Sequence, residues 1–193
     1  MSSQIGTYHL ADNPQLYEIQ RQNNYEFVVH GLEDIMRAGA LGNESNAIIT
    51  NAQEVLRIAV SKAFIPHYSQ EVVEIKRGNT TLKYAGVPKF DEGQLEFHDF
   101  IGADVKSVLK AWQNLSYNAT TEKVGSLDVT NYKKDCYLME YTPDYRLVRT
   151  WRLYGCWISK LSESEYTNDS GEKHMIQCTI QYDHAEIDLS GNA

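Results

Sequence analysis

The chain has 193 residues and a formal net charge of −8, from 26 acidic and 18 basic side chains. Hydrophobic residues make up 42% and charged residues 23%, which is typical of a globular chain and argues against low-complexity disorder. The excess of acidic side chains makes the chain a poor candidate for binding a nucleic-acid phosphate backbone, because affinity for phosphate groups comes mostly from Lys and Arg.

In chain order, residues 1–24 are predicted to form an N-terminal arm, residues 25–187 a single domain, and residues 188–193 a C-terminal tail. Tyr25–Val29 is the first candidate strand. A long connection over residues 30–54 leads to a second candidate strand, Val55–Phe64. Both candidate strands are rich in β-branched or aromatic residues.

A β-hairpin over residues 71–86 is the most informative local feature. A two-residue Gly78-Asn79 turn places Gly at the first central position, as a type II′ turn requires. Pairing across this turn sets four apolar residues on one face: Val73 opposite Tyr84 and Ile75 opposite Leu82. Glu74 then meets Lys83 on the reverse face. Turn chemistry, apolar register and charge pairing therefore agree on one alignment.

A strand at Leu95–Phe100 precedes the one segment with clear helical periodicity, residues 103–113. Its apolar stripe has helical spacing, and it consists of Val105, Val108, Leu109 and Trp112. Asp104 in the first turn and Lys110 near the last both suit the helix macrodipole.

Three further strands are predicted in the C-terminal half: Cys136–Tyr141, Leu147–Trp157 and His174–Asp183. In Leu147–Trp157 one face is expected to hold Trp151, Leu153 and Trp157. The last segment alternates with a period of two, with its apolar side formed by Ile176, Cys178, Ile180 and Tyr182. The fold class is therefore mainly β, with one flanking helix.

No catalytic or metal site is marked by the sequence. Phosphate loops, GxSxG elbows, GxGxxG turns and HExxH pairs do not occur, and His98 and Asp99 should point to opposite faces of their strand. The three cysteines have no CxxC spacing and are expected to be buried free thiols. We therefore expect no enzyme activity, metal or cofactor.

No apolar run approaches the roughly 18 residues of a membrane span, and the first twenty residues lack the apolar core of a signal peptide. We therefore expect no membrane segment. For localisation, we expect the protein to be made in the cytoplasm and not to be exported through a signal peptide.

Four segments in order resemble the tail tube protein family of contractile-tailed bacteriophages and related phage-tail-like particles. The resemblance covers roughly residues 55–187, and the segments that carry it are VVEIKRGNTTLKYAGVPKF, QLEFHDFIGADVKSVLKAWQN, RTWRLYGCW and CTIQYDHAEI. The resemblance implies an antiparallel β-sandwich or barrel-like domain, six copies in a ring, and rings stacked into a hollow tube. It also implies a virion protein made in the bacterial host cytoplasm, with sheath, baseplate and tape-measure proteins as partners and DNA as transiting cargo.

Two surfaces are candidates for function. The apolar hairpin face of Val73, Ile75, Leu82 and Tyr84 is predicted to contact a neighbouring subunit or ring, because a projecting ribbon with such a face needs a partner. The acidic residues of the C-terminal third are predicted to lie on the channel lining or the outer surface, and they include Glu163, Glu165, Asp169 and Glu172.

Several alternatives remain open from the sequence. The same resemblance fits the tube of a tailocin or of a secretion-type injection system, and it fits a baseplate tube initiator. A monomeric binding module and an enzyme with a site assembled from distant residues are the alternatives from other classes.

Overall fold

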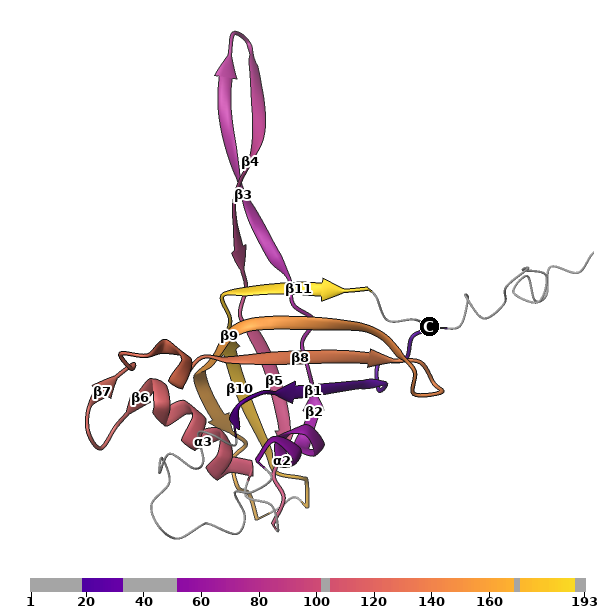
Figure 1. Ribbon diagram of the computed structural model, residues 1–193, viewed down its shortest axis with the longest axis vertical. Coiled ribbons are helices and arrows are strands. Elements are labelled where there is room, and N and C mark those ends of the chain that lie inside the picture. Colours follow the sequence, from indigo (N-terminus) through magenta and orange to yellow (C-terminus); the bar gives the residue numbers. More distant parts are fainter. Residues whose placement is uncertain (1–18, 33–51, 102–104, 169–170, 190–193) are drawn as a thin grey trace, which may run out of the picture.

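In the computed structural model, the described residues are 19–32, 52–101, 105–168 and 171–189. Most of the predicted N-terminal arm and of the connection over residues 30–54 lies outside them, as do Asp169 and the tail beyond Leu189. The described part is mainly β, with the chain arranged as a curled antiparallel sheet, two helices and a long hairpin (Figure 1).

The main sheet contains seven strands in the order β1-β8-β9-β10-β5-β2, with β11 also pairing with β9. Their bounds are β1 Tyr25–Val29, β2 Val60–Lys62, β5 Gly93–His98, β8 Lys134–Tyr141, β9 Leu147–Glu163, β10 Met175–Gln181 and β11 His184–Asp188. All the pairings are antiparallel. Because the first and last strands of this order do not pair with each other, the sheet forms a half-barrel.

Two helices cover one face of the curled sheet (Figure 1). Helix α3 spans Val105–Ser116 and packs against β9, so the predicted stripe is buried and the helix ends three residues later than expected. Helix α2 spans Ala52–Ala59 and packs against β1. The core between helices and sheet includes Leu56, Trp112 and Leu153.

The predicted strand at Val55–Phe64 was wrong. Its first half is helix α2, and only Val60–Lys62 forms a strand, the short β2. Ala52, Leu56 and Ala59 are buried at a helical spacing of four and three residues. The β-branched residues of this segment suggested a strand. The helical spacing of its apolar residues instead lets a helix bury them against the sheet.

Strand β9 changes direction at Gly155. The predicted alternation fails there, because the buried residues of β9 are Leu153, Cys156 and Ile158, which places Trp157 on the opposite face from Leu153. Gly155 has φ of 66°, and the register against β8 shifts by one residue at this point. A bulge of this kind bends a strand, so β9 can serve both halves of the curled sheet.

Strands β10 and β11 form one interrupted ladder along the same strand, β9. The pairing register from Ile180 to Gln181 continues unchanged from His184 to Asp188. The predicted strand at His174–Asp183 is confirmed, with Ile176, Cys178, Ile180 and Tyr182 buried.

Strands β3, Tyr68–Arg77, and β4, Thr80–Phe90, form the predicted hairpin, and among the described residues they pair only with each other. Val73 opposes Tyr84, Ile75 opposes Leu82 and Glu74 opposes Lys83, as the sequence predicted. Gly78 has φ of 62° at the first central position of the turn. A bulge at Gly86 shifts the register toward the root of the hairpin, where a Cβ on this glycine would lie 2.6 Å from the Glu71 carbonyl oxygen.

Three small elements complete the described chain at one side of the body (Figure 1). They are strands β6, Tyr117–Asn118, and β7, Lys123–Val124, which pair with each other, and the 3-10 helix η4, Val129–Asn131.

Candidate assembly surfaces

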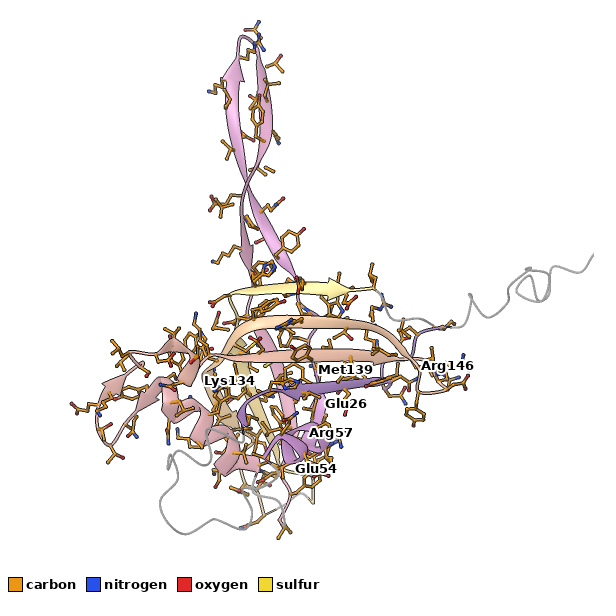
Figure 2. All side chains as sticks on the ribbon, in the orientation of Figure 1. Glu26, Glu54, Arg57, Lys134, Met139 and Arg146 are labelled. Carbon is orange, nitrogen blue, oxygen red and sulfur yellow. The ribbon has the colours of Figure 1, made fainter. Side chains whose placement is uncertain are left out.

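The hairpin stands clear of the body along the long axis of the molecule, with side chains exposed on both faces (Figures 1 and 2). The four predicted interface residues all have large exposed fractions: Val73 48%, Ile75 52%, Leu82 36% and Tyr84 52%. On the reverse face the Lys83 ammonium lies 3.5 Å from the Glu74 carboxylate. The apolar face therefore forms no part of the core of its own subunit.

An aromatic root anchors the hairpin to the body. It consists of Phe64, Tyr68, Phe90, Tyr182 and His184. The Phe90 ring centroid lies 5.5 Å from that of Tyr68, 5.8 Å from that of Tyr182 and 5.1 Å from that of His184. The Tyr182 hydroxyl donates to the His67 carbonyl at 3.3 Å, and burial raises the pKa of this phenol. Aromatic contacts of this kind fix the direction in which the ribbon leaves the sheet.

Strands β1, β2 and β11 are edge strands of the main sheet. Between β1 and β2 lies an open groove of about 940 Å³, lined by residues from both strands and from the segment before β1. The Arg57 guanidinium of α2 donates a hydrogen bond to the Glu26 carboxylate of β1 at 2.9 Å (Figure 2). Edge strands carry unpaired backbone groups on one side, so they are natural sites for pairing between copies.

The sheet face opposite the helices carries a cation between two aromatic rings. The Arg152 guanidinium lies 4.5 Å from the Tyr154 ring centroid and 5.5 Å from that of Tyr137. It also lies 3.4 Å from the Asp135 carboxylate, and the Tyr154 hydroxyl donates to Glu186. No sequence prediction covered this group, although Asp135 and Tyr137 alternate along the sequence with the buried Cys136 and Leu138.

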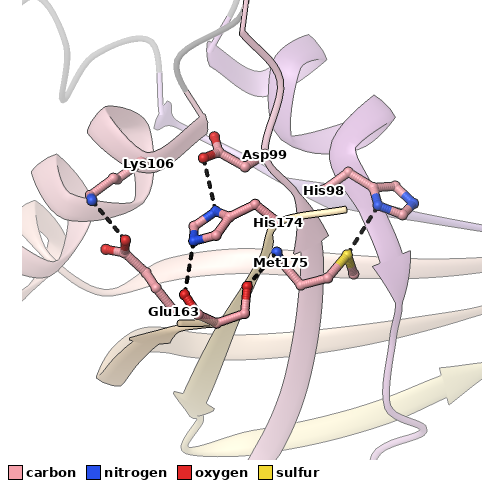
Figure 3. Close-up of polar contacts among 7 residues, drawn as sticks. His98, Asp99, Lys106, Glu163, His174 and Met175 are labelled. Atoms are coloured by element: carbon pink, nitrogen blue, oxygen red, sulfur yellow. Dashed lines mark hydrogen bonds and ion pairs between the residues drawn. The ribbon is translucent and has the colours of Figure 1, made fainter. Parts of the chain in front are cut away.

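At the end of the sheet away from the hairpin, a polar cluster joins three segments (Figure 3). His174 bonds through Nδ1 to Asp99 at 3.1 Å and through Nε2 to the Ser164 carbonyl at 3.0 Å, and its ring stacks on Tyr166 at 4.6 Å. The Met175 amide donates to the Ser164 hydroxyl. The tertiary structure thus gives both ring nitrogens of His174 a partner.

The predicted acidic residues gather near this cluster without forming one site. Glu163 lies 2.7 Å from the Lys106 ammonium, and this hydrogen bond raises the pKa of Lys106. Glu165 and Glu172 are exposed, and Asp169 lies outside the described residues. Their location on a channel lining or on the outer surface stays a prediction.

The described residues contain no group of three or more His, Cys, Asp or Glu side chains placed to hold a metal ion. Strand β5 ends at His98, whose Nδ1 lies 3.2 Å from the Met175 sulfur, whereas Asp99 bonds to His174. All three cysteines are buried free thiols. Burial raises the pKa of Cys178 to about 12 and that of Cys136 well above its ordinary value.

The sequence profile of the family described as T4-like virus tail tube protein gp19 matches residues 46–186. The chain belongs to this tail tube family. It is therefore a structural tube protein of the contractile type, as the order of the hairpin, helix and closing strands predicted. No curated protein sequence matches the chain.

Solved structures show that this tail tube protein shares its fold with tubes of contractile injection systems. One is from the sheath-tube complex of an extracellular contractile injection system, PVC, in the extended state, with 15% identity, a TM-score of 0.62 and coverage of 97% of this chain and 99% of that chain. Another is from the PVC sheath/tube terminator, with 16% identity, a TM-score of 0.60 and coverage of 89% and 97%.

A third is from the tube-terminating cap of the anti-feeding prophage, with 13% identity, a TM-score of 0.59 and coverage of 90% and 93%. At these identities the likeness establishes the fold alone. Within the described part of this tail tube protein, no helix has the length and apolar character to cross a membrane.

Proposed function

We propose that the protein assembles into hexameric rings that stack into the inner tube of a contractile tail, and that this tube conducts DNA during ejection. The observation that carries the proposal is the long hairpin with an apolar face, exposed in the single subunit and attached to a tail tube fold. Exposed apolar ribbons of this size are costly in water and favour association between copies.

Closure of the ring is supported by the edges of the sheet. Strands β1 and β11 lie at opposite edges of the part formed by β1, β8, β9 and β11. If β1 of one copy pairs with β11 of the next, the free backbone N–H and C=O groups of both edge strands form hydrogen bonds. The same pairing can repeat around a closed ring. The sheets of six copies would then form one continuous barrel around the channel.

We also propose the partners that membership of the tail tube family implies. A sheath surrounds the tube, a baseplate starts it, and a tape-measure protein occupies the channel before DNA passes. A solved relative is described as part of a sheath-tube complex, which supports the sheath as a partner. The net charge of −8 suits a channel that does not retain phosphate groups.

A tube-terminating or tube-initiating role is the second candidate. Two of the similar structures are described as a sheath/tube terminator and a tube-terminating cap. A terminator or initiator would form a single ring and stop, whereas a tube protein forms stacks of increasing length. The tube of a tailocin or secretion-type system would form the same stacks without a DNA-filled head.

Electron microscopy and sedimentation velocity of the purified protein test the proposal. We expect hexameric rings and stacked tubes from the unaltered chain. Ile75→Asp should give a cooperatively melting subunit that no longer forms tubes, because an assembled contact would bury an unpaired carboxylate at every repeat.

Val124→Asp on strand β7 is the matched control, since Val124 is also exposed on a short two-stranded ribbon. It should assemble like the unaltered chain. A monomer at high concentration would contradict the tube function, and single rings without stacks would favour the terminator role.

A further inference from the structure

We infer that the end of the sheet away from the hairpin is fastened by His174 in its protonated, cationic form, and that this end loosens when the imidazolium loses a proton. The device, here called the latch, consists of His174, Asp99 and Ser164. It joins the chain after β5 and after β9 to the start of β10. The inference goes beyond the proposed tube function and does not depend on it.

The two bonds of the His174 ring require a proton on each ring nitrogen. Nδ1 lies 3.1 Å from the Asp99 carboxylate, and Nε2 lies 3.0 Å from the Ser164 carbonyl oxygen (Figure 3). An ionised carboxylate and a backbone carbonyl only accept hydrogen bonds, whereas a neutral imidazole has a single N–H to donate. Both bonds are therefore made together only by the imidazolium.

The packing of the ring favours its charged form. The His174 ring stacks on that of Tyr166, with centroids 4.6 Å apart and an angle of 2° between the planes. A cation over an aromatic face is attracted by the negative face of the ring. The His174 side chain is only 15% exposed, so water does not fully replace a bond that the neutral ring gives up.

Charged and titratable groups reach this end from every element that meets there. His98, at the end of β5, faces the Met175 sulfur at 3.2 Å, and Lys106 of α3 bonds to Glu163 of β9 at 2.7 Å. The acidic side chains on these segments are Asp99, Glu163, Glu165 and Glu172. The basic ones are Lys106 and Lys173. The excess of carboxylates also favours a cationic ring at position 174.

Three backbone amides beside the latch report whether it is closed. The Asp99 amide donates to the His174 carbonyl at 3.2 Å. The Ser164 amide donates to the Met175 carbonyl at 3.0 Å, and the Met175 amide donates to the Ser164 hydroxyl at 3.0 Å. These bonds lie at the ends of the strands, where the ladder is most easily opened, so their protection depends on the latch.

The direction of the pH dependence follows from the two ring bonds. Imidazole ordinarily takes its second proton as the pH falls through about 6.5, and a carboxylate stays ionised above about pH 4. Between these values the ring makes both bonds and the latch is closed. As the pH rises, the ring keeps one N–H, so one of the two bonds is lost. The exposed rings of Phe100 and Tyr166 lie on the joined segments, so pH sets how rigidly this end presents them.

Histidine ¹⁵N spectra and hydrogen exchange of the full chain test the inference. At about pH 5.5 we expect both ring nitrogens of His174 to carry protons. Between about pH 5.5 and 8, the protection factors of the Asp99, Ser164 and Met175 amides, each taken against the intrinsic exchange rate at that pH, should fall at least about fivefold. His174→Gln should remove this dependence, because an amide side chain does not titrate. His98→Gln is the matched control at the same end and should keep the dependence.

Asp99→Asn separates the latch from a merely structural role. The Asn side-chain amide can donate to Nδ1, so a neutral His174 ring with its proton on Nε2 makes both bonds. The three amides should then stay protected at about pH 8, within about twofold of their values at pH 5.5. Glu165→Gln removes the charge of an exposed carboxylate nearby and should leave the pH dependence of the unaltered chain in place.

Four results would overturn the inference. One is a neutral His174 ring at about pH 5.5. The second is protection of the three amides that does not change with pH in the unaltered chain. The third is a fall in Asp99→Asn as large as that in the unaltered chain. The fourth is loss of the dependence in His98→Gln, which would assign it to the other histidine.

Discussion

Gly155 shows how one residue sets the path of the longest strand. Its φ of 66° lies in the left-handed region that favours glycine. The backbone amide of Asp183 donates to the Tyr154 carbonyl beside it at 2.9 Å. The Asp183 carboxylate, which lies 2.6 Å from the Lys133 ammonium, sits where a side chain on residue 155 would be.

We predict that Gly155→Ala lowers the free energy of unfolding by at least about 1–2 kcal/mol, the cost of the left-handed backbone alone. The new Cβ would also collide with the Asp183 carboxylate. Thermal melts of the subunit measure the change. Gly171→Ala is the control, since a Cβ there meets no atom within 4 Å, and equal melting temperatures of the two variants would contradict the explanation.

Because its thiols are buried, the subunit should have a free energy of unfolding that depends on pH in the alkaline range. Burial raises the pKa of Cys178 from 9.0 to about 12. Above pH 9 the unfolded chain releases a proton that the native state keeps, so the free energy of unfolding should fall as the pH rises from 9 toward 12. Below pH 9 this contribution is constant.

Urea unfolding of the unaltered chain and of Cys178→Ala at several alkaline pH values measures this dependence. The variant is expected to be less stable at neutral pH, because it leaves a cavity, yet to lose less stability as the pH rises. Part of the dependence should remain, because burial also raises the pKa of Cys136. Parallel curves for the two proteins would show that Cys178 does not contribute.

Among the elements, helix α3 connects the sheet to the segment before β8. Trp112 is buried with 1% of its surface exposed, and its indole Nε1 donates to the Tyr132 carbonyl at 3.0 Å. One side chain thus combines a large apolar contact area with a bond that positions the chain entering β8.

We predict that Trp112→Ala destabilises the subunit by about 3–5 kcal/mol, the usual cost of truncating a large buried aromatic residue. Trp112→Phe should cost less, because it keeps most of the contact area and loses the bond to Tyr132. Denaturant unfolding measures both changes. Val124→Ala, at an exposed position, is the control. If Trp112→Ala is as stable as this control, the prediction is contradicted.

At the scale of the whole molecule, the subunit combines a protected sheet with an unprotected ribbon. Strands β8, β9 and β10 each have partners on both sides. Within the part of the chain that the structure describes, the hairpin strands β3 and β4 pair only with each other, and nearly all of their residues are exposed. Local stability should therefore be high in the sheet and low toward the tip of the hairpin.

Hydrogen exchange measures this difference. In the unassembled subunit we expect the slowest amides in β8, β9 and β10 and fast exchange near Gly78. In assembled tubes the hairpin amides should exchange far more slowly, while those of the central strands change little. Hairpin amides that exchange equally fast in both forms would contradict a role for the hairpin in assembly.

The sequence by itself determined the features that depend on neighbours in the chain. The Gly78-Asn79 turn, the alternating apolar residues and the opposite charges of Glu74 and Lys83 specify one hairpin register, and the structure has it. The stripe of helix α3 and the alternation of β10 are equally local, since each element buries one face at its own period.

Only the tertiary structure decided the features that join distant segments. Ala52–Ala59 is helical because its apolar phase fits against β1, although its β-branched residues suggested a strand. His174 meets Asp99 from 75 positions away, a pairing that no local pattern encodes. The exposure of Ile75 and the direction in which the hairpin leaves the body also depend on the packed sheet, because burial and direction are properties of the whole fold and not of a single segment.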